Sequence, residues 1–414
     1  MFVCPRTGGK LPPSISSLVQ LPAATSPSYP RQVATLQRHY RALSNQARCQ
    51  GAINHPKCSA KTLTPSNAST PRIPHRPISS STPTNGPNQE VWRVESTSPT
   101  EPTIDAIFET NTGTWQYLIS DPATSSAVII DPVLDFDRTT QTVSTRSADS
   151  LLRMVRDRGY KIEMILETHV HADHLTSAAY LQQHLAQSQG FKPPIGIGKR
   201  IEKVQTLFGH RYAVPMGEYT AVFDKLFDDD ETFKIGNLTA MAVHLPGHTP
   251  DHLGYRIGGM YSLPHPFITH IILLVNDIEN IFCGDSIFHA DIGTARCDFP
   301  GGSARDLFRS GRKLLSFPGH FKIWTGHDYP PADREQPRPW MSVQEHRQQN
   351  KHLKDGTTEE QYVSLREARD AQMQAPKLLH QSLQINIRAG QLPTPTEAGH
   401  RMVHVPMKFE GGEW

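Results

Sequence analysis

The sequence predicts an α+β fold in which helices flank two groups of strands, as in a four-layer αββα sandwich. Short β-rich runs predict a first group of strands between residues 104 and 132, and a second group runs from residue 233 to 257. Segments with apolar residues at helical spacing lie between and after these groups. Clusters of His and Asp directly follow several strand-like runs, so we expect a functional site at one edge of the sheets.

The first group of strands is expected to form a β-meander. Its runs, separated by Asn-Thr-Gly and Asp-Pro turns, cover residues 107–108, 115–119 and 127–132. A helix over 147–160 follows, with Ser147 or Asp149 as its expected N-cap. Asp131-Pro132 ends the third strand near the expected site, where it either belongs to the site or only marks a turn.

Helices and strands then alternate towards the C-terminus. Strands are expected over 164–166, 281–282 and 320–324. Helices are expected over 178–189, 201–208, 306–317, 343–354 and 359–373. We interpret residues 341–414 as a helical and irregular tail that packs on the domain and is not a separate catalytic unit.

Seven candidate metal ligands occur in four groups, each after an apolar strand-like run. The groups lie in Thr-His-Val-His-Ala-Asp-His, Leu-Pro-Gly-His-Thr, Cys-Gly-Asp-Ser and Thr-Gly-His-Asp-Tyr. The candidates are His169, His171, Asp173, His174, His248, Asp285 and His327. A chain with 21 histidines can produce one His-x-His pair by chance, but four strand-end groups in this order indicate a metal site.

These seven residues permit a centre with two metal ions, each held by imidazoles and carboxylates. The first site would comprise His169, His171 and His248, and the second Asp173, His174 and His327. Asp285 could bind one ion or bridge both. Two ions in such a centre can share a hydroxide that attacks a carbonyl carbon. The spacing alone leaves the number of ions open.

The same motifs resemble the metallo-β-lactamase superfamily over roughly residues 103–340. The resemblance rests on His-x-His-x-Asp-His, followed by Pro-Gly-His, Gly-Asp and Gly-His. It implies a four-layer αββα metallo-β-lactamase sandwich with the metal at the edge where the two sheets meet. Gly-Thr-Ala-Arg-Cys-Asp-Phe at 293–299 and Gly-His-Asp-Tyr at 326–329 are similar to the persulfide dioxygenase (sulfur dioxygenase) branch, whose mitochondrial members oxidise glutathione persulfide.

Resemblance to that branch implies one Fe(II) per subunit, held here by His169, His248 and Asp285. Two histidines and one carboxylate leave open positions for O₂ and substrate. The remaining candidates would orient the ligands and bound water, or bind a second metal; they are His171, Asp173, His174 and His327. The implied reaction oxidises glutathione persulfide with O₂ to sulfite and glutathione, in sulfide detoxification.

Residues next to the motifs are candidates for substrate binding. Arg296 could hold a glutathione carboxylate through a two-pronged contact, and Tyr329 could hydrogen-bond the substrate. The alternatives are a structural ion pair between Arg296 and Asp298 and an ordinary loop tyrosine. Cys297 is interpreted as a small buried or loop residue, because the metal site already accounts for the chemistry.

Other functions remain open. The main alternative is a glyoxalase-II-like thioesterase, which would use one or two Zn(II) ions to hydrolyse a glutathione thioester; other metallo-hydrolases come next. The Arg-Cys-Asp-Phe motif favours the dioxygenase, and the tail from Trp340 has no evident match to the helical glutathione-binding domain of glyoxalase II. A non-catalytic binding protein on this fold would be expected to lack a ligand, and none of the seven is lost.

Residues 1–95 are interpreted as a disordered basic leader. Residues 1–89 contain ten Lys and Arg and no Asp or Glu, whereas the rest of the chain has 32 basic and 40 acidic residues. An acid-free start rich in Arg and Ser is typical of a transit peptide, so we expect the mitochondrial matrix as the location. The alternatives are a cytoplasmic protein with a basic tail, or an over-long gene model.

Residues 258–276 form an atypical insertion, because the superfamily normally has a short hairpin here. The insertion is either a lid or membrane-touching loop, or a retained intron in the gene model. Three histidines near the motifs are expected to be satisfied by the backbone, although His252 could help to orient a ligand; they are His244, His252 and His289.

Composition also bears on partners. No run reaches the ~18 apolar residues of a membrane span, and Lys and Arg form no basic stripe for nucleic acid. Three of the five cysteines lie in the leader, so Cys283 and Cys297 form no disulfide pattern. The expected partners are glutathione persulfide and O₂. A homodimer is left open, and a sulfur-transferase partner would be a separate protein because no rhodanese-like segment is evident.

Overall fold

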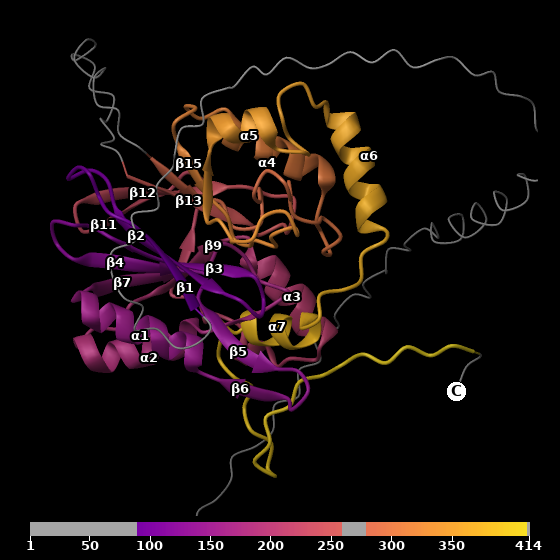
Figure 1. The fold of residues 1–414 in the computed structure, drawn as a ribbon. Helices are drawn as coiled ribbons and strands as arrows, with labels where there is room; N and C mark the ends of the chain where they lie inside the picture. The colour runs from indigo at the N-terminus through magenta and orange to yellow at the C-terminus, as the bar shows by residue number, and fades with distance from the viewer. Residues whose placement is uncertain (1–88, 259–278, 412–414) are drawn as a thin grey trace, which may run out of the picture. The chain divides into compact units, whose positions relative to one another are not determined.

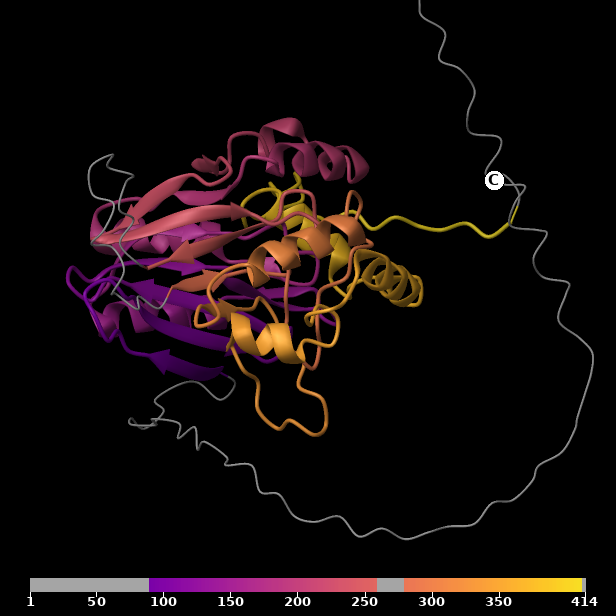
Figure 2. The same ribbon diagram turned by 90° about the horizontal axis from the view of Figure 1, so that it is seen from above.

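The structure is a computed structural model that describes residues 89–258 and 279–411. In this part of the chain two sheets lie face to face with helices on their outer faces, as the ribbon in Figure 1 and the view from above in Figure 2 show. The expected insertion beyond Gly258 and nearly all of the expected leader lie outside the described residues.

The two large sheets are formed by consecutive parts of the chain. The first sheet has the order β1-β2-β3-β4-β7-β9-β10, with bounds Gln89–Val94, Thr103–Glu109, Thr114–Ser120, Ser126–Ile130, Lys161–Leu166, Ile195–Gly198 and Lys225–Phe227. The second runs from β11 to β16, with bounds Thr232–Ile235, Leu238–His244, Leu253–Ile257, Asn280–Phe282, Lys322–Trp324 and Trp340–Ser342. A small third sheet joins β6 (Thr142–Ser144), β5 (Val133–Asp137) and β8 (Leu175–Thr176).

The helices fall into an N-terminal and a C-terminal set. The first set comprises α1 (Arg146–Arg158), α2 (Ala178–Gln189), α3 (Ile201–Arg211) and the single 3₁₀ turn η1 (Met216–Glu218). The second comprises α4 (Ala304–Leu315), α5 (Val343–Gln349), α6 (Glu359–Asp370) and α7 (Leu379–Asn386).

Three apolar clusters fill the spaces between the layers. Aromatic side chains lie between the two sheets, among them Tyr117, Tyr255, Phe282 and Trp324. Residues of α1, α2 and α3 pack on the outer face of the first sheet, and residues of α4 on the outer face of the second. Burying both faces of each sheet removes the apolar strand residues from water. The four-layer αββα sandwich expected from the sequence is therefore confirmed.

Strand direction brings the predicted ligand groups to one edge of the sandwich. β4 is parallel to β7 in the first sheet, and β14 is parallel to β15 in the second. β12 runs in the same direction as β14, because two antiparallel pairings through β13 separate them. The loops after β7, β12, β14 and β15 are the four that carry the ligand candidates.

Several boundaries differ from those expected. β1 (Gln89–Val94) pairs with β2 over its whole length, so the fold begins within the expected leader of residues 1–95. β16 pairs with β15, so the expected boundary at residue 340 cuts through a strand of the second sheet. Helix α1 begins after Thr145 rather than at Ser147 or Asp149, and α7 was not expected. None of the described helices has the length and apolar composition that crossing a bilayer requires.

Candidate metal centre

The loop after β7 carries four of the seven ligand candidates, with their imidazoles and carboxylate turned inward. His169, His171 and His174 are at most 2% exposed. Each of these rings has one buried nitrogen without a hydrogen-bond partner: Nε2 in His169, Nδ1 in His171 and Nε2 in His174. Leaving such atoms unpaired inside a protein is costly, so their arrangement fits a bound cation.

The three later loops bring their candidates to the same place. The Nε2 atom of His248 lies 3.7 Å from Oδ2 of Asp285. The Nε2 atom of His327 lies 3.2 Å from Oδ2 of Asp173 and 3.5 Å from Oδ1 of Asp285. All seven residues predicted as ligands are thus brought together at one edge of the sandwich.

Each of the five histidines has its other ring nitrogen engaged by the protein. The Nδ1 atom of His248 donates to the carbonyl oxygen of Arg296 at 2.7 Å, and that of His327 to the carbonyl oxygen of Gly113 at 3.2 Å. The Nδ1 atom of His174 faces the carbonyl oxygen of Leu175 at 3.3 Å. In the neutral rings these contacts place the proton on the nitrogen that faces away from the centre, so the inward nitrogen has its lone pair available for a metal.

The same reasoning assigns the tautomer of His169. Its Nδ1 atom lies 3.0 Å from Oγ1 of Thr168, and that hydroxyl donates its single proton to Asp131 at 2.8 Å. The hydroxyl oxygen therefore accepts from Nδ1 of His169, which leaves Nε2 as the ligand atom.

Within the centre, the ligand atoms form two compact groups. One ligand atom from each of His169, His248 and Asp285 lies within 4.8 Å of the other two. A second group of the same size comprises His171, Asp173 and His174. Both groups consist of two histidines and one carboxylate, so the second would suit a neighbouring ion.

Burial and neighbouring charges set the protonation of the metal-free centre. Burial, joined by neighbouring imidazoles, lowers the pKa of His169 well below its usual range and lowers that of His174 to about 3. Burial alone would raise the pKa of Asp173, but the imidazoles of His327 and His174 bring it down to about 2. Two imidazoles are therefore neutral and one carboxylate ionised at pH 7, as metal ligands must be.

His171 is tied to two buried carboxylates. Its Nε2 atom lies 3.1 Å from Oδ1 of Asp131 and 3.3 Å from Oε2 of Glu167. Asp131 also accepts from the backbone N–H of Thr168 and has a φ of 50°. Asp131 therefore both turns the chain after β4 and belongs to the site, and Glu167 was not expected there.

Glycines precede His248 and His327 because the chain passes too close to other atoms for any side chain. A Cβ atom on Gly247, whose φ is +140°, would lie 2.3 Å from backbone atoms of Leu307 in α4. A Cβ atom on Gly326 would lie 2.5 Å from Oδ1 of Asp285, a ligand atom.

Gly247→Ala is expected to destabilise the metal-free protein by about 2 to 3 kcal/mol, because the methyl group overlaps backbone that cannot move aside. Guanidinium unfolding of the metal-free protein measures the change. Gly217→Ala is the control, since a Cβ there meets nothing within 4 Å. Equal unfolding midpoints for the two variants would contradict the tight approach at Gly247.

The two candidate substrate residues differ in what surrounds them. Arg296 pairs with Asp298 and donates to the carbonyl oxygen of Gln374 at 2.8 Å, so the structural ion pair is formed. Tyr329 is 51% exposed, and its ring lies parallel to that of His327 with centroids 5.7 Å apart. Tyr329 is thus open to solvent directly beside the centre, whereas Arg296 is already engaged.

The three nearby histidines contact the site to different degrees. His252 accepts from the backbone N–H of Asp285 at 2.9 Å and so helps to place that carboxylate. Nδ1 of His289 pairs with Asp291 at 2.8 Å, and that of His244 lies 3.8 Å from Asp229. The expectation of a backbone partner is thus met by His252, which also supports a ligand residue.

Cys297 is expected to be unreactive. Burial, together with the nearby Asp370 carboxylate, raises the pKa of its thiol, so the nucleophilic thiolate is scarce at neutral pH. Iodoacetamide labelling at pH 8, followed by peptide mapping, should leave native Cys297 unmodified, and Cys297→Ala should keep its activity. Rapid labelling of Cys297 in the folded protein would contradict this.

The C-terminal segment supplies contacts to the centre that sequence reasoning missed. Asn386 of α7 and Arg366 and Asp370 of α6 bind backbone groups of the ligand loops. Nothing local in the sequence marks them, because polar residues on a helix usually face water.

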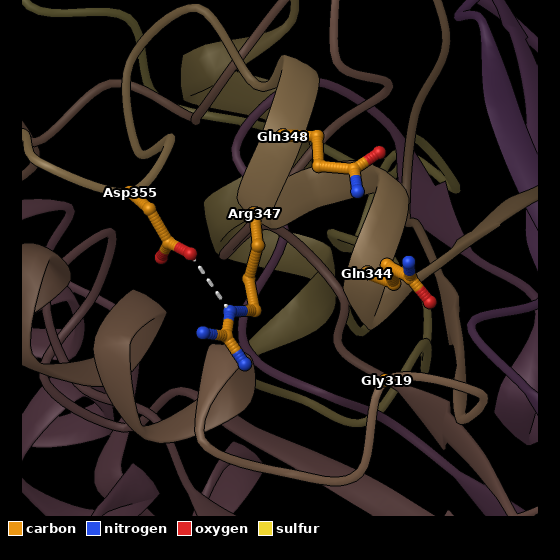
Figure 3. Close-up of a pocket in the computed structure, with 5 residues that line it drawn as sticks. All are labelled: Gly319, Gln344, Arg347, Gln348 and Asp355. Carbon is orange, nitrogen blue, oxygen red and sulfur yellow. Dashed lines mark hydrogen bonds and ion pairs between the residues drawn. The ribbon is translucent and has the colours of Figure 1, made fainter.

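A shallow pocket elsewhere shares no residue with the metal centre. It has a volume of about 310 Å³ and is lined by Gly319, Gln344, Arg347, Gln348 and Asp355 (Figure 3). Two of these lining residues, Arg347 and Asp355, form an ion pair with each other.

Comparisons with known proteins agree with this geometry. The sequence model of the metallo-beta-lactamase superfamily matches residues 110–327. A probable metallo-hydrolase of Burkholderia pseudomallei is 37% identical over 74% of this chain and 99% of its own length. Glyoxylase B2 of Dictyostelium discoideum is 36% identical over 74% of this chain and 97% of its own length.

Other similar proteins are named as persulfide dioxygenase or ETHE1. The mitochondrial persulfide dioxygenase of Mus musculus is 25% identical over 54% of this chain and 67% of its own length. The crystal structure of ETHE1 from Myxococcus xanthus superposes with a TM-score of 0.51 at 23% identity, over 70% of this chain and 99% of that one. That likeness shows the fold. With the matched model and the seven assembled ligands, the chain belongs to the metallo-β-lactamase superfamily.

Proposed function

We propose that this protein is a persulfide dioxygenase that oxidises glutathione persulfide with O₂. The observation that carries the proposal is the group formed by His169, His248 and Asp285, whose ligand atoms lie within 4.8 Å of one another. Two histidines and one carboxylate are the ligand set of non-haem Fe(II) oxygenases, and they leave coordination positions free.

A ferrous ion held by these residues would supply the electron transfer that O₂ activation needs, which Zn(II) does not provide. In the overall reaction, glutathione persulfide, O₂ and water give glutathione, sulfite and two protons. The terminal sulfur is oxidised by four electrons, and O₂ accepts them.

The chain's own residues prepare the site for this reaction. Tyr329 is partly exposed beside His327, so a substrate that enters from solvent can contact its side chain. Asp131 and Glu167 hold His171 through Nε2, which keeps that ring in place beside His169. A contact between Arg296 and a glutathione carboxylate would require the guanidinium to exchange its partner Asp298.

Relatives support the proposal in part. Similarity to the mitochondrial persulfide dioxygenase of Mus musculus covers 54% of the chain, and the 293–299 motif agrees with that branch. The more similar relatives are named as a metallo-hydrolase and as Glyoxylase B2.

A glyoxalase-II-like thioesterase is the second candidate, and one observation favours it. The group of His171, Asp173 and His174 is as compact as the first, so a second ion would have a complete set of ligands nearby. A dinuclear centre of this kind would hydrolyse a glutathione thioester with Zn(II).

A paired assay separates the two functions. The protein is loaded anaerobically with Fe(II) or with Zn(II), and each form is given glutathione persulfide and S-lactoylglutathione. We expect O₂ uptake only from the Fe(II) form with the persulfide, and slow or absent thioester hydrolysis from both forms. Efficient thioester hydrolysis by the Zn(II) form, without O₂ uptake by the Fe(II) form, would support the thioesterase instead.

We further propose that the protein acts in the mitochondrial matrix, because residues 1–89 are basic and contain no acidic residue. Microscopy of the full chain fused at its C-terminus to a fluorescent protein tests this. A diffuse cytoplasmic signal would contradict it.

A further inference from the structure

The metal-binding loop after β7 leaves two backbone carbonyls without a partner in any strand or helix. They belong to His171 and His174, both of which are ligand candidates. Asn386 of α7 donates to both carbonyl oxygens, at 2.8 Å each, across more than 200 residues of sequence. Its own carbonyl oxygen accepts from the backbone N–H of Thr176 at 2.9 Å. One buried amide thus satisfies three backbone groups of this loop.

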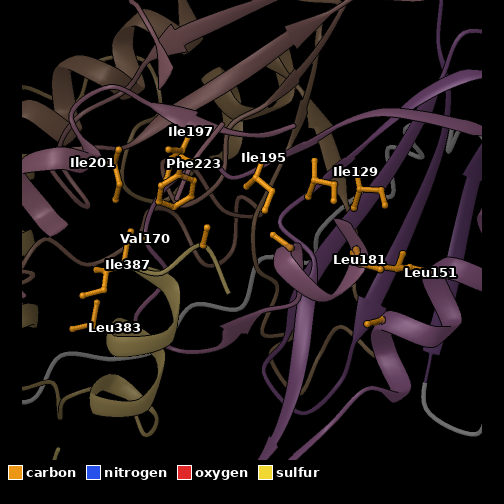
Figure 4. Close-up of a cluster of buried hydrophobic side chains, with 14 of the residues drawn as sticks. Ile129, Leu151, Val170, Leu181, Ile195, Ile197, Ile201, Phe223, Leu383 and Ile387 are labelled. Atoms are coloured by element: carbon orange, nitrogen blue, oxygen red, sulfur yellow. The ribbon is translucent and has the colours of Figure 1, made fainter. Parts of the chain in front are cut away.

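Apolar packing seats α7 on the same loop. Val170 lies between the ligands His169 and His171, and it shares a buried cluster with Leu383 and Ile387 (Figure 4). Four residues beyond the end of α7, a Cβ atom on Gly390 would lie 2.8 Å from the carbonyl oxygen of Thr176. Helix α7 therefore cannot shift without disturbing the loop.

Helix α6 supports a second ligand, His248, through the loop of residues 293–299. Arg366, 2% exposed, donates to the carbonyl oxygens of Thr294 at 3.2 Å and Ala295 at 3.1 Å. Asp370 accepts from Arg366 at 2.6 Å and from the backbone N–H of Cys297 at 2.8 Å. The residue between these anchors is Arg296, whose carbonyl oxygen accepts from Nδ1 of His248.

We propose that α6 and α7 set the geometry of the metal centre, with Asn386, Arg366 and Asp370 as positioning residues. A planar amide that bridges two carbonyls fixes their separation, and with it the directions of the side chains at 171 and 174. The anchored 293–299 loop fixes the position of the Arg296 carbonyl oxygen, and this oxygen orients the imidazole of His248. The inference concerns the metal ligands alone, so it holds for a persulfide or a thioester as substrate.

Helix α7 contains a matched control for Asn386. Gln384 is also 2% exposed, and its amide also donates to two carbonyl oxygens, those of His380 and His404. It accepts from the backbone N–H of His404 at 2.9 Å. Gln384 therefore makes the same number of hydrogen bonds from the same helix, but away from the ligand loop.

The test compares Asn386→Asp with Gln384→Glu in the full chain. Each change replaces two donors by a carboxylate oxygen without changing side-chain size. Co(II) alone is the probe: its dissociation constant comes from competition with a chromophoric chelator, and its d–d absorption reports ligand geometry. Thermal unfolding of the metal-free variants measures the general loss of stability.

We expect Asn386→Asp to raise the Co(II) dissociation constant about 10- to 100-fold and to change the d–d spectrum. Gln384→Glu should lower the unfolding temperature to a similar extent while leaving both Co(II) readouts close to those of the natural chain. Equal changes in Co(II) affinity for the two variants, or an unchanged affinity and spectrum for Asn386→Asp, would overturn the proposal.

A milder variant covers the case in which Asn386→Asp does not fold. Asn386→Ser keeps one donor and should give a smaller loss of Co(II) affinity, again with an altered spectrum. For α6, Arg366→Lys cannot reach both carbonyl oxygens and Asp370 at once, so it should weaken Co(II) binding. Arg309→Lys should not, because this exposed arginine of α4 pairs with Asp306 and Glu359. Natural Co(II) affinity in both Asn386→Ser and Arg366→Lys would also overturn the proposal.

Discussion

Replacing His248 by Ala is expected to abolish the reaction with glutathione persulfide and to remove the iron. His248 is one of the three residues of the first group, with His169 and Asp285, and its Nε2 atom faces Asp285. Loss of a ligand should exceed the about 10- to 100-fold effect typical of residues that only orient ligands. The measurements are O₂ uptake and iron content after anaerobic loading.

His244→Ala provides the control for this variant. His244 ends β12, four residues before His248, and its imidazole faces Asp229 instead of the centre. It should keep full iron content and activity. Retention of iron and of O₂ uptake by His248→Ala would show that the first group is not the functional site.

The second large effect concerns the number of metal ions. For a mononuclear iron centre, His174→Ala should leave one iron per chain and lower activity about 10- to 100-fold, because His174 then only orients neighbouring groups. For a dinuclear centre, the same change should remove one of two ions. Metal content by mass spectrometry and the activity of the same sample together distinguish the mononuclear from the dinuclear centre.

We expect one iron per chain both before and after the His174 substitution. Two ions in the natural chain that fall to one in His174→Ala, with loss of activity to the level of His248→Ala, would contradict the mononuclear centre. Asp173→Asn should behave as His174→Ala does, because both belong to the second group.

The seven ligand candidates could be predicted from the sequence because each is encoded locally. A ligand such as His169 or Asp285 follows directly on an apolar strand, and strands of a sandwich deliver their ends to a common edge. The glycines before His248 and His327 are part of the same local signal, since the structure leaves no room for a side chain there.

The support for the centre could not be predicted, because it depends on contacts between distant parts of the chain. Asn386 lies 215 residues from His171, and the sequence around it suggested only an irregular tail. Arg366 lies in the helix expected over 359–373, but nothing in the sequence indicated that its side chain is almost fully buried against the 293–299 loop. The pairing of β1 with β2 likewise became evident only in three dimensions.

The central claim, an iron-dependent oxidation of a persulfide, is tested most directly by the ratio of sulfite formed to O₂ consumed. Fe(II)-loaded protein is mixed with glutathione persulfide in an oxygen-electrode cell, and sulfite is quantified in the same sample. We predict rapid uptake with one sulfite formed for each O₂ consumed. Protein shown to contain iron that consumes no O₂ and forms no sulfite would contradict the account.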